Sequence, residues 1–226
     1  MISTETSYNG LRRRASLALL VLVNLLPLVG VLYFDWDVAG LMVLYWSENL
    51  VLGFYTLAKM LIISPLGGLG LGAFFCIHYG GFCAGHGLFI TTLLLNQHID
   101  PMPGDPWPLF LVFPQLLINV VREVMNYAPP EWMFAFAALF ASHGISFVLN
   151  FLLGPEREET SAKQLMSAPY GRIFVLHIAI IGGGIAVMAL GQPIGMLLVL
   201  VLLKLGLDVT LHLREHRKLA ASAAAG

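Results

Sequence analysis

Long apolar runs are the feature that most constrains how this chain can fold. A helix needs about 20 mostly apolar residues to cross the hydrocarbon core of a bilayer, and seven segments reach about that length. Only 11% of the residues are charged, whereas a soluble domain carries about 25%. The sequence therefore predicts an all-α, polytopic transmembrane helix bundle and excludes a soluble enzyme. The apolar segments lie near residues 15–34, 37–62, 68–95, 107–127, 131–154, 171–191 and 194–213.

The fourth of these segments differs from the others because polar residues share one face of the helix. Gln115 and Asn119 begin this stripe, and Arg122, Glu123 and Asn126 continue it. A helix with one polar and one apolar face suits the membrane interface better than the hydrocarbon core. We therefore expect six spans and one interfacial helix near 115–127, within a single transmembrane domain covering residues 1–226. Seven spans are the alternative.

The distribution of basic residues favours the six-span topology. With six spans, nearly all Lys and Arg residues outside the spans fall on one side, including Arg12, Arg13, Arg14 and Arg157. Cytoplasmic loops carry an excess of Lys and Arg, so we expect both termini to be cytoplasmic. The formal net charge is −1, which gives no basic surface for nucleic acid.

Ionisable residues inside the predicted spans are the main functional signal. Charged side chains are costly in the membrane and mark functional sites there. Five of the seven histidines also fall in predicted spans, and histidine is a common metal ligand. The candidate metal ligands are Glu48, His78, His86, His143, His177, Asp208 and His212.

These residues suggest a membrane-embedded metalloprotein. Asp208 and His212 are four residues apart, so they lie on one face of the last predicted span. One or two divalent ions, with zinc as the expected metal, would activate a bound water for attack on a lipid-like ester or amide. Glu48 or Asp208 would be the catalytic general base. A purely structural reading is also open, in which Glu48 is a neutral hydrogen-bonded acid and Lys204 neutralises Asp208.

Two other functions use the same residues. An ion or proton transporter would use Glu48, Asp208 and the histidines as a relay. A b-type haem protein would use two facing histidines, such as His78 and His143. In each case we expect membrane lipids as partners, and a homo-oligomer stays open.

Several motifs carry a resemblance to a known family. The motifs YWSEN, HYG-x-F-x3-H, SH-x2-SF-x2-N and K-x3-D-x3-H resemble an uncharacterised family of bacterial multi-pass membrane proteins of unknown function. This resemblance implies a bacterial inner membrane location and assigns no activity.

Two further resemblances are to characterised membrane enzymes. Asp208 and His212 are similar in style to the intramembrane zinc hydrolases of the alkaline ceramidase and adiponectin-receptor kind, although the H-x3-H and S-x3-H motifs are absent. The segment around Ser146 resembles the G-x-S-G motif of rhomboid-like proteases without its final glycine, with His177 as the partner.

Overall fold

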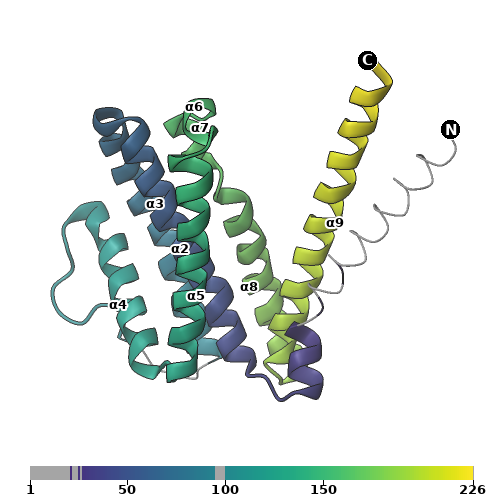
Figure 1. Ribbon diagram of the computed structural model, residues 1–226. Coiled ribbons are helices and arrows are strands. Elements are labelled where there is room, and N and C mark those ends of the chain that lie inside the picture. The colour runs from purple at the N-terminus through teal and green to yellow at the C-terminus, as the bar shows by residue number, and fades with distance from the viewer. Residues whose placement is uncertain (1–20, 22–24, 26, 95–99, 226) are drawn as a thin grey trace, which may run out of the picture.

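The structure is a computed structural model that describes residues 21, 25, 27–94 and 100–225, without the side chains of residues 208 and 211–225. These residues form helices and no strands, which confirms the predicted all-α bundle (Figure 1). Half of the first predicted span, 15–34, lies outside the described residues. The longer helices are α2 (Val38–Ile63), α3 (Pro65–Leu93), α4 (Val112–Tyr127), α5 (Pro130–Ser146), α8 (Tyr170–Leu190) and α9 (Ile194–Ala225). The short elements are η1 (Leu109–Leu111), the π-helix η2 (Phe147–Leu152), α6 (Glu156–Glu159) and α7 (Ala162–Ser167).

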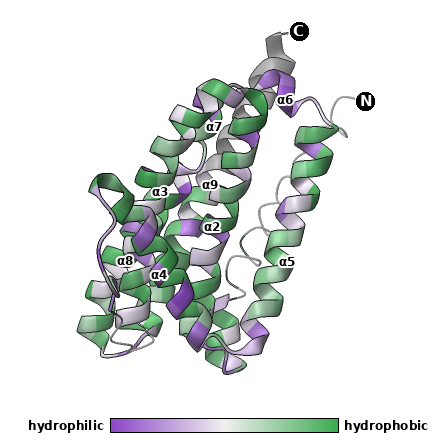
Figure 2. Cartoon of the chain, turned by 90° about the vertical axis from the view of Figure 1, so that its left-hand side faces the viewer, coloured by the Kyte–Doolittle hydropathy of each residue, from purple (hydrophilic) through white to green (hydrophobic). Residues whose placement is uncertain are grey.

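Five helical segments of the described chain are long and apolar enough to cross a membrane. They are Val38–Ile63, Pro65–Leu93, Leu109–Tyr127, Pro130–Leu152 and Ala162–Leu190. Ile194–Leu207 is a shorter apolar helix. Large apolar side chains are exposed along these segments, for example Phe134 at 77% and Met188 at 75%, and Figure 2 shows hydrophobic residues along the outer faces of the long helices. This surface is consistent with a membrane protein.

Local sequence signals determine where the helices begin and end. The Asp37 carboxylate accepts hydrogen bonds from the backbone N–H groups of Ala39 and Gly40 and so caps the start of α2. Pro65 has no N–H group and suits the first turn of a helix, so α3 begins directly after Ser64. Gly191 ends α8 in the left-handed conformation at φ 63°, which glycine adopts without strain. Tight turns at these sites produce the α2–α3 and α8–α9 hairpins (Figure 1).

The segment expected to form the interfacial helix has a different arrangement from the one its polar stripe suggests. α4 runs alongside α3, and both α3 and α4 end at the end of the bundle where α5 begins (Figure 1). Gln115 and Asn119 are buried, whereas Arg122 and Asn126 are exposed. Gln115 accepts from the Trp107 N–H at 2.7 Å and donates to the Asp105 carbonyl at 3.0 Å. The polar stripe therefore binds the preceding loop, and its placement in the membrane interface stays a prediction.

The core lies where α2, α3, α4, α8 and α9 meet. Trp46 of α2 is 2% exposed, and its indole N–H donates to the Cys83 carbonyl at 2.7 Å. Gly87 of α3 allows this close approach, because a Cβ there would lie 2.5 Å from the Trp46 ring. This contact sets the rotation of α2 about its own axis relative to α3. It therefore also sets the direction in which Glu48, two residues after Trp46, projects from α2.

Candidate functional site

Glu48 lies near the middle of α2 and forms an ion pair with α8. Its Oε2 is 2.5 Å from a guanidinium nitrogen of Arg172. The side chain of Glu48 is 20% exposed and that of Arg172 is 43% exposed. A charged side chain at such a depth in a spanning helix is normally paired and lines a functional path.

His143 of α5 approaches the same carboxylate from a third helix. Its Nε2 is 3.8 Å from the Glu48 Oε1. This distance is too long for a direct hydrogen bond, but a water molecule can bridge two groups at such a separation. Glu48 thus has a permanent cation against one oxygen and a titratable imidazole near the other.

A cavity of about 400 Å³ lies between α2, α8 and α9, beside the ion pair. Its polar lining consists of Tyr45, Glu48, Asn49, Arg172 and Lys204, and leucine and valine side chains complete the wall. The Lys204 ammonium lies 5.0 Å from the centre of the Tyr45 ring, a distance at which the cation is attracted to the ring face. Charged and polar side chains from three helices therefore face one space.

Asn49 adds an unused hydrogen-bond acceptor to this cavity. Its side chain donates from Nδ2 to the Tyr45 carbonyl at 2.9 Å. The Oδ1 atom is buried and has no partner among the described residues, although Asn49 is only 4% exposed. A buried polar atom without a partner costs free energy, so this oxygen is an unsatisfied acceptor in the wall of the cavity.

Glu48 also borders a second, smaller cavity between α2 and α5. This cavity has a volume of about 220 Å³ and is otherwise lined by Leu41, Leu44, Tyr45, Ala135 and Leu139. The carboxylate therefore lies between two cavities, one on the α8–α9 side and one on the α5 side.

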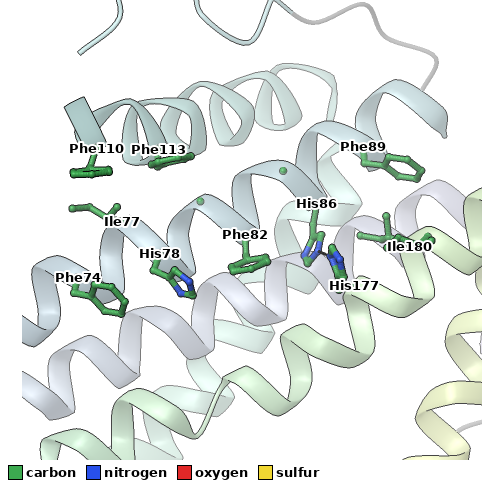
Figure 3. A pocket seen from close by; sticks show the side chains of 13 residues that line it. Phe74, Ile77, His78, Phe82, His86, Phe89, Phe110, Phe113, His177 and Ile180 are labelled. Atoms are coloured by element: carbon green, nitrogen blue, oxygen red, sulfur yellow. Dashed lines mark hydrogen bonds between the residues drawn. The ribbon is translucent and has the colours of Figure 1, made fainter. Parts of the chain in front are cut away.

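The remaining candidate histidines form two further pairs. His86 of α3 and His177 of α8 point toward one another (Figure 3), with Nε2 of His86 3.0 Å from Nδ1 of His177. Nδ1 of His78 lies 2.9 Å from the Tyr170 hydroxyl. The described candidate residues are thus divided among three places: Glu48 with His143, His86 with His177, and His78 with Tyr170.

This division bears on the predicted metal site. Among the residues that the structure describes, no group of three or more His, Cys, Asp or Glu side chains could hold a metal ion. The side chains of Asp208 and His212 lie outside the described residues, so a zinc site that includes them stays a prediction. The one or two zinc ions and the hydrolase chemistry depend on those two residues.

The other sequence-based alternatives find no support from the contacts. The Ser146 hydroxyl accepts a hydrogen bond from Asn150 at 3.0 Å, while His177 is paired with His86. The two histidines proposed for haem, His78 and His143, each have a different neighbour. Among the described residues, the contacts therefore do not bring together the Ser146–His177 pair of a serine protease or the His78–His143 pair of a haem site.

The surroundings of Glu48 were only partly predicted from the sequence. Arg172 was not among the candidate site residues, and Tyr45 and Asn49 were present only within the YWSEN motif. The signal that could have found Arg172 is its place at the start of an apolar run, since an arginine near a span requires a counter-charge.

Comparisons with known proteins give a family and no activity. No curated protein and no solved structure matches the chain. Residues 7–225 match a family model described as a family of unknown function, DUF6498. This match covers nearly the whole length, which agrees with the resemblance to a family of unknown function. The chain therefore belongs to the DUF6498 family.

Proposed function

We propose that the protein is an ion or proton transporter in which the Glu48 carboxylate changes partner during transport. The observation that carries this proposal is that Glu48 borders both cavities while it is held by Arg172 of α8 and approached by His143 of α5. A carboxylate between two cavities is the arrangement that a relay needs, because it can be reached from either one.

The ion pair gives this carboxylate two alternative states. While Glu48 is ionised, Arg172 neutralises it and α2 is held to α8. When Glu48 takes up a proton, its attraction to Arg172 is lost, and Arg172 and Lys204 are then two cations on the wall of one cavity without a carboxylate between them. Protonation of Glu48 thereby raises the positive charge of the cavity on the α8–α9 side.

His143 is suited to supply this proton. An imidazole can both donate and accept a hydrogen, and Nε2 of His143 lies 3.8 Å from the Glu48 Oε1. The π-helix η2, in which Asn150 lies, begins at Phe147, about one helical turn after His143. Such π-helical turns occur frequently at functional sites.

The transporter is favoured over the hydrolase because its residues are already together. Glu48, His143 and Arg172 come from three helices, and His143 and Arg172 each lie within 3.8 Å of the Glu48 carboxylate. A zinc hydrolase needs three ligands in one place, and it would depend on Asp208 and His212. We place the protein in a bacterial inner membrane, as the resemblance to a bacterial family implies, with both termini cytoplasmic, as the distribution of basic residues indicates.

Proton flux into proteoliposomes tests this proposal. The protein is reconstituted with a pH-sensitive dye inside, and a membrane potential is imposed with potassium and valinomycin. We expect flux above that of empty liposomes, its loss in Glu48→Gln, and its retention in Glu158→Gln, which neutralises an exposed glutamate in α6. Equal flux in wild type and Glu48→Gln, or none in wild type with protons, sodium or chloride, would overturn the proposal.

A further inference from the structure

A third cavity, larger than the two beside Glu48, lies on the outer side of α3. This groove has a volume of about 790 Å³ and is formed by α3, α8, η1 and the start of α4 (Figure 3). Small-molecule sites in proteins typically have volumes of about 300–1,000 Å³. The groove follows helices that are long and apolar enough to cross a membrane, so its occupant is expected to come from the lipid phase.

The groove is aromatic and carries no charge. None of the described residues that line it is Asp, Glu, Lys or Arg. Its only polar side chains are His78, His86 and His177. A lipid with a phosphate head would leave its negative charge unpaired here, which is costly in an apolar site. The lining also includes five phenyl rings, Phe74, Phe82, Phe89, Phe110 and Phe113, which suit a flat aromatic head.

The hydrogen bond between His86 and His177 in the wall of this groove has a defined donor and a defined acceptor. His86 is 5% exposed, and its Nδ1 is buried without a partner among the described residues. An unpaired buried acceptor is tolerated better than an unpaired buried N–H, so we assign the hydrogen of His86 to Nε2, which donates to Nδ1 of His177. A neutral His177 then carries its own hydrogen on Nε2. This nitrogen, on a half-buried side chain that lines the groove, is a donor for a ligand.

We propose that the groove binds a lipid quinone, whose ring carbonyl accepts a hydrogen bond from Nε2 of His177. The quinone ring is uncharged and flat, and its carbonyl is an acceptor, which matches the three properties of the lining. The isoprenoid tail would follow the apolar groove toward the lipid phase. This site is separate from the Glu48 cavity and does not depend on the proposed transport.

Gly85 of α3 leaves the space that the ring would fill. A Cβ at Gly85 would meet no atom within 4 Å, although this residue lines the groove. Gly85→Leu therefore places a branched side chain in the groove, starting from a Cβ that meets open space. Gly70 is a matched control, because it lies in the same helix, has equally open space around it and does not line the groove.

Binding of decylubiquinone to the purified full-length protein in dodecylmaltoside tests the proposal by isothermal titration. We expect saturable, stoichiometric binding that is weakened roughly tenfold in His177→Leu, as for the loss of one hydrogen bond with its buried partner left unsatisfied. Binding should be abolished in Gly85→Leu and unchanged in Gly70→Leu. The melting temperature of each variant shows whether it is folded.

Three results would overturn the assignment of a quinone. The first is no saturable binding of decylubiquinone by the wild type. The second is equally tight binding of dioctanoylglycerol or dioctanoylphosphatidylglycerol, which would make the groove a general lipid site. The third is unchanged quinone affinity in both Gly85→Leu and His177→Leu, which would place the quinone elsewhere. Because none of these measurements uses flux, they are independent of the transport proposal.

Discussion

The ion pair between Glu48 and Arg172 leads to a quantitative prediction for a double-mutant cycle. The cycle compares wild type with Glu48→Gln, Arg172→Gln and the double variant, and the coupling energy is the part of the destabilisation that does not add. Glutamine replaces both charges with side chains that keep a similar length and can still form hydrogen bonds. The measured quantity therefore reports mainly on the electrostatic attraction.

The structure sets the expected size of this coupling. Two unit charges about 4 Å apart attract by about 4 kcal/mol at an effective dielectric constant near 20. The Arg172 side chain is 43% exposed, so solvent screening and desolvation offset much of this attraction. We expect a coupling of about 1–2 kcal/mol, between the ~0.2–1 kcal/mol of surface pairs and the ~3–5 kcal/mol lost when a buried pair is broken.

The free energy of unfolding is measured by titrating the protein in dodecylmaltoside micelles with sodium dodecyl sulfate and following tryptophan fluorescence. Arg157, an exposed arginine of α6, provides a matched control, and Arg157→Gln should show no coupling with Glu48→Gln. A coupling between Glu48 and Arg172 within about 0.3 kcal/mol of zero would refute the reasoning, because the two charges would then not hold α2 against α8.

Three further predictions concern the core, the loop before α4 and the metal. Trp46→Phe removes the hydrogen bond to the Cys83 carbonyl and should destabilise the protein by about 1–3 kcal/mol in the same titration; an unchanged midpoint would contradict this. Gln115→Leu should speed hydrogen exchange at 101–107, since both loop hydrogen bonds of Gln115 are lost, and equal exchange would show that the loop is held otherwise. Elemental analysis separates the two functions: the transporter proposed for Glu48 needs no stoichiometric zinc, whereas zinc that disappears in His86→Ala and His212→Ala would restore the metallohydrolase.

The sequence was sufficient to predict the helices and most of their ends. Apolar length alone predicts spans near 37–62 and 68–95, and the structure has Val38–Ile63 and Pro65–Leu93. These boundaries are local properties, since Asp37 caps one helix and Pro65 begins the other. Glu48 was likewise identified as a site residue from its depth in an apolar helix.

The partners of these residues could not be predicted, because they depend on the rotation of each helix about its axis. Five histidines in the spans suggested one metal site, but the packing faces His86 toward His177 and His143 toward Glu48. Likewise, the polar stripe of α4 has the same pattern whether it faces water or a loop. Only the fold shows that Gln115 and Asn119 bind the segment before them.

Proton flux through the reconstituted protein tests directly whether the Glu48 carboxylate takes part in transport. The comparison is between wild type, Glu48→Gln and Glu158→Gln in proteoliposomes with equal protein content, at the same imposed potential. We expect proton flux in wild type and in Glu158→Gln. In Glu48→Gln we expect only the background rate of empty liposomes. Flux that is unchanged in Glu48→Gln would contradict it, because the carboxylate between the two cavities would then take no part in transport.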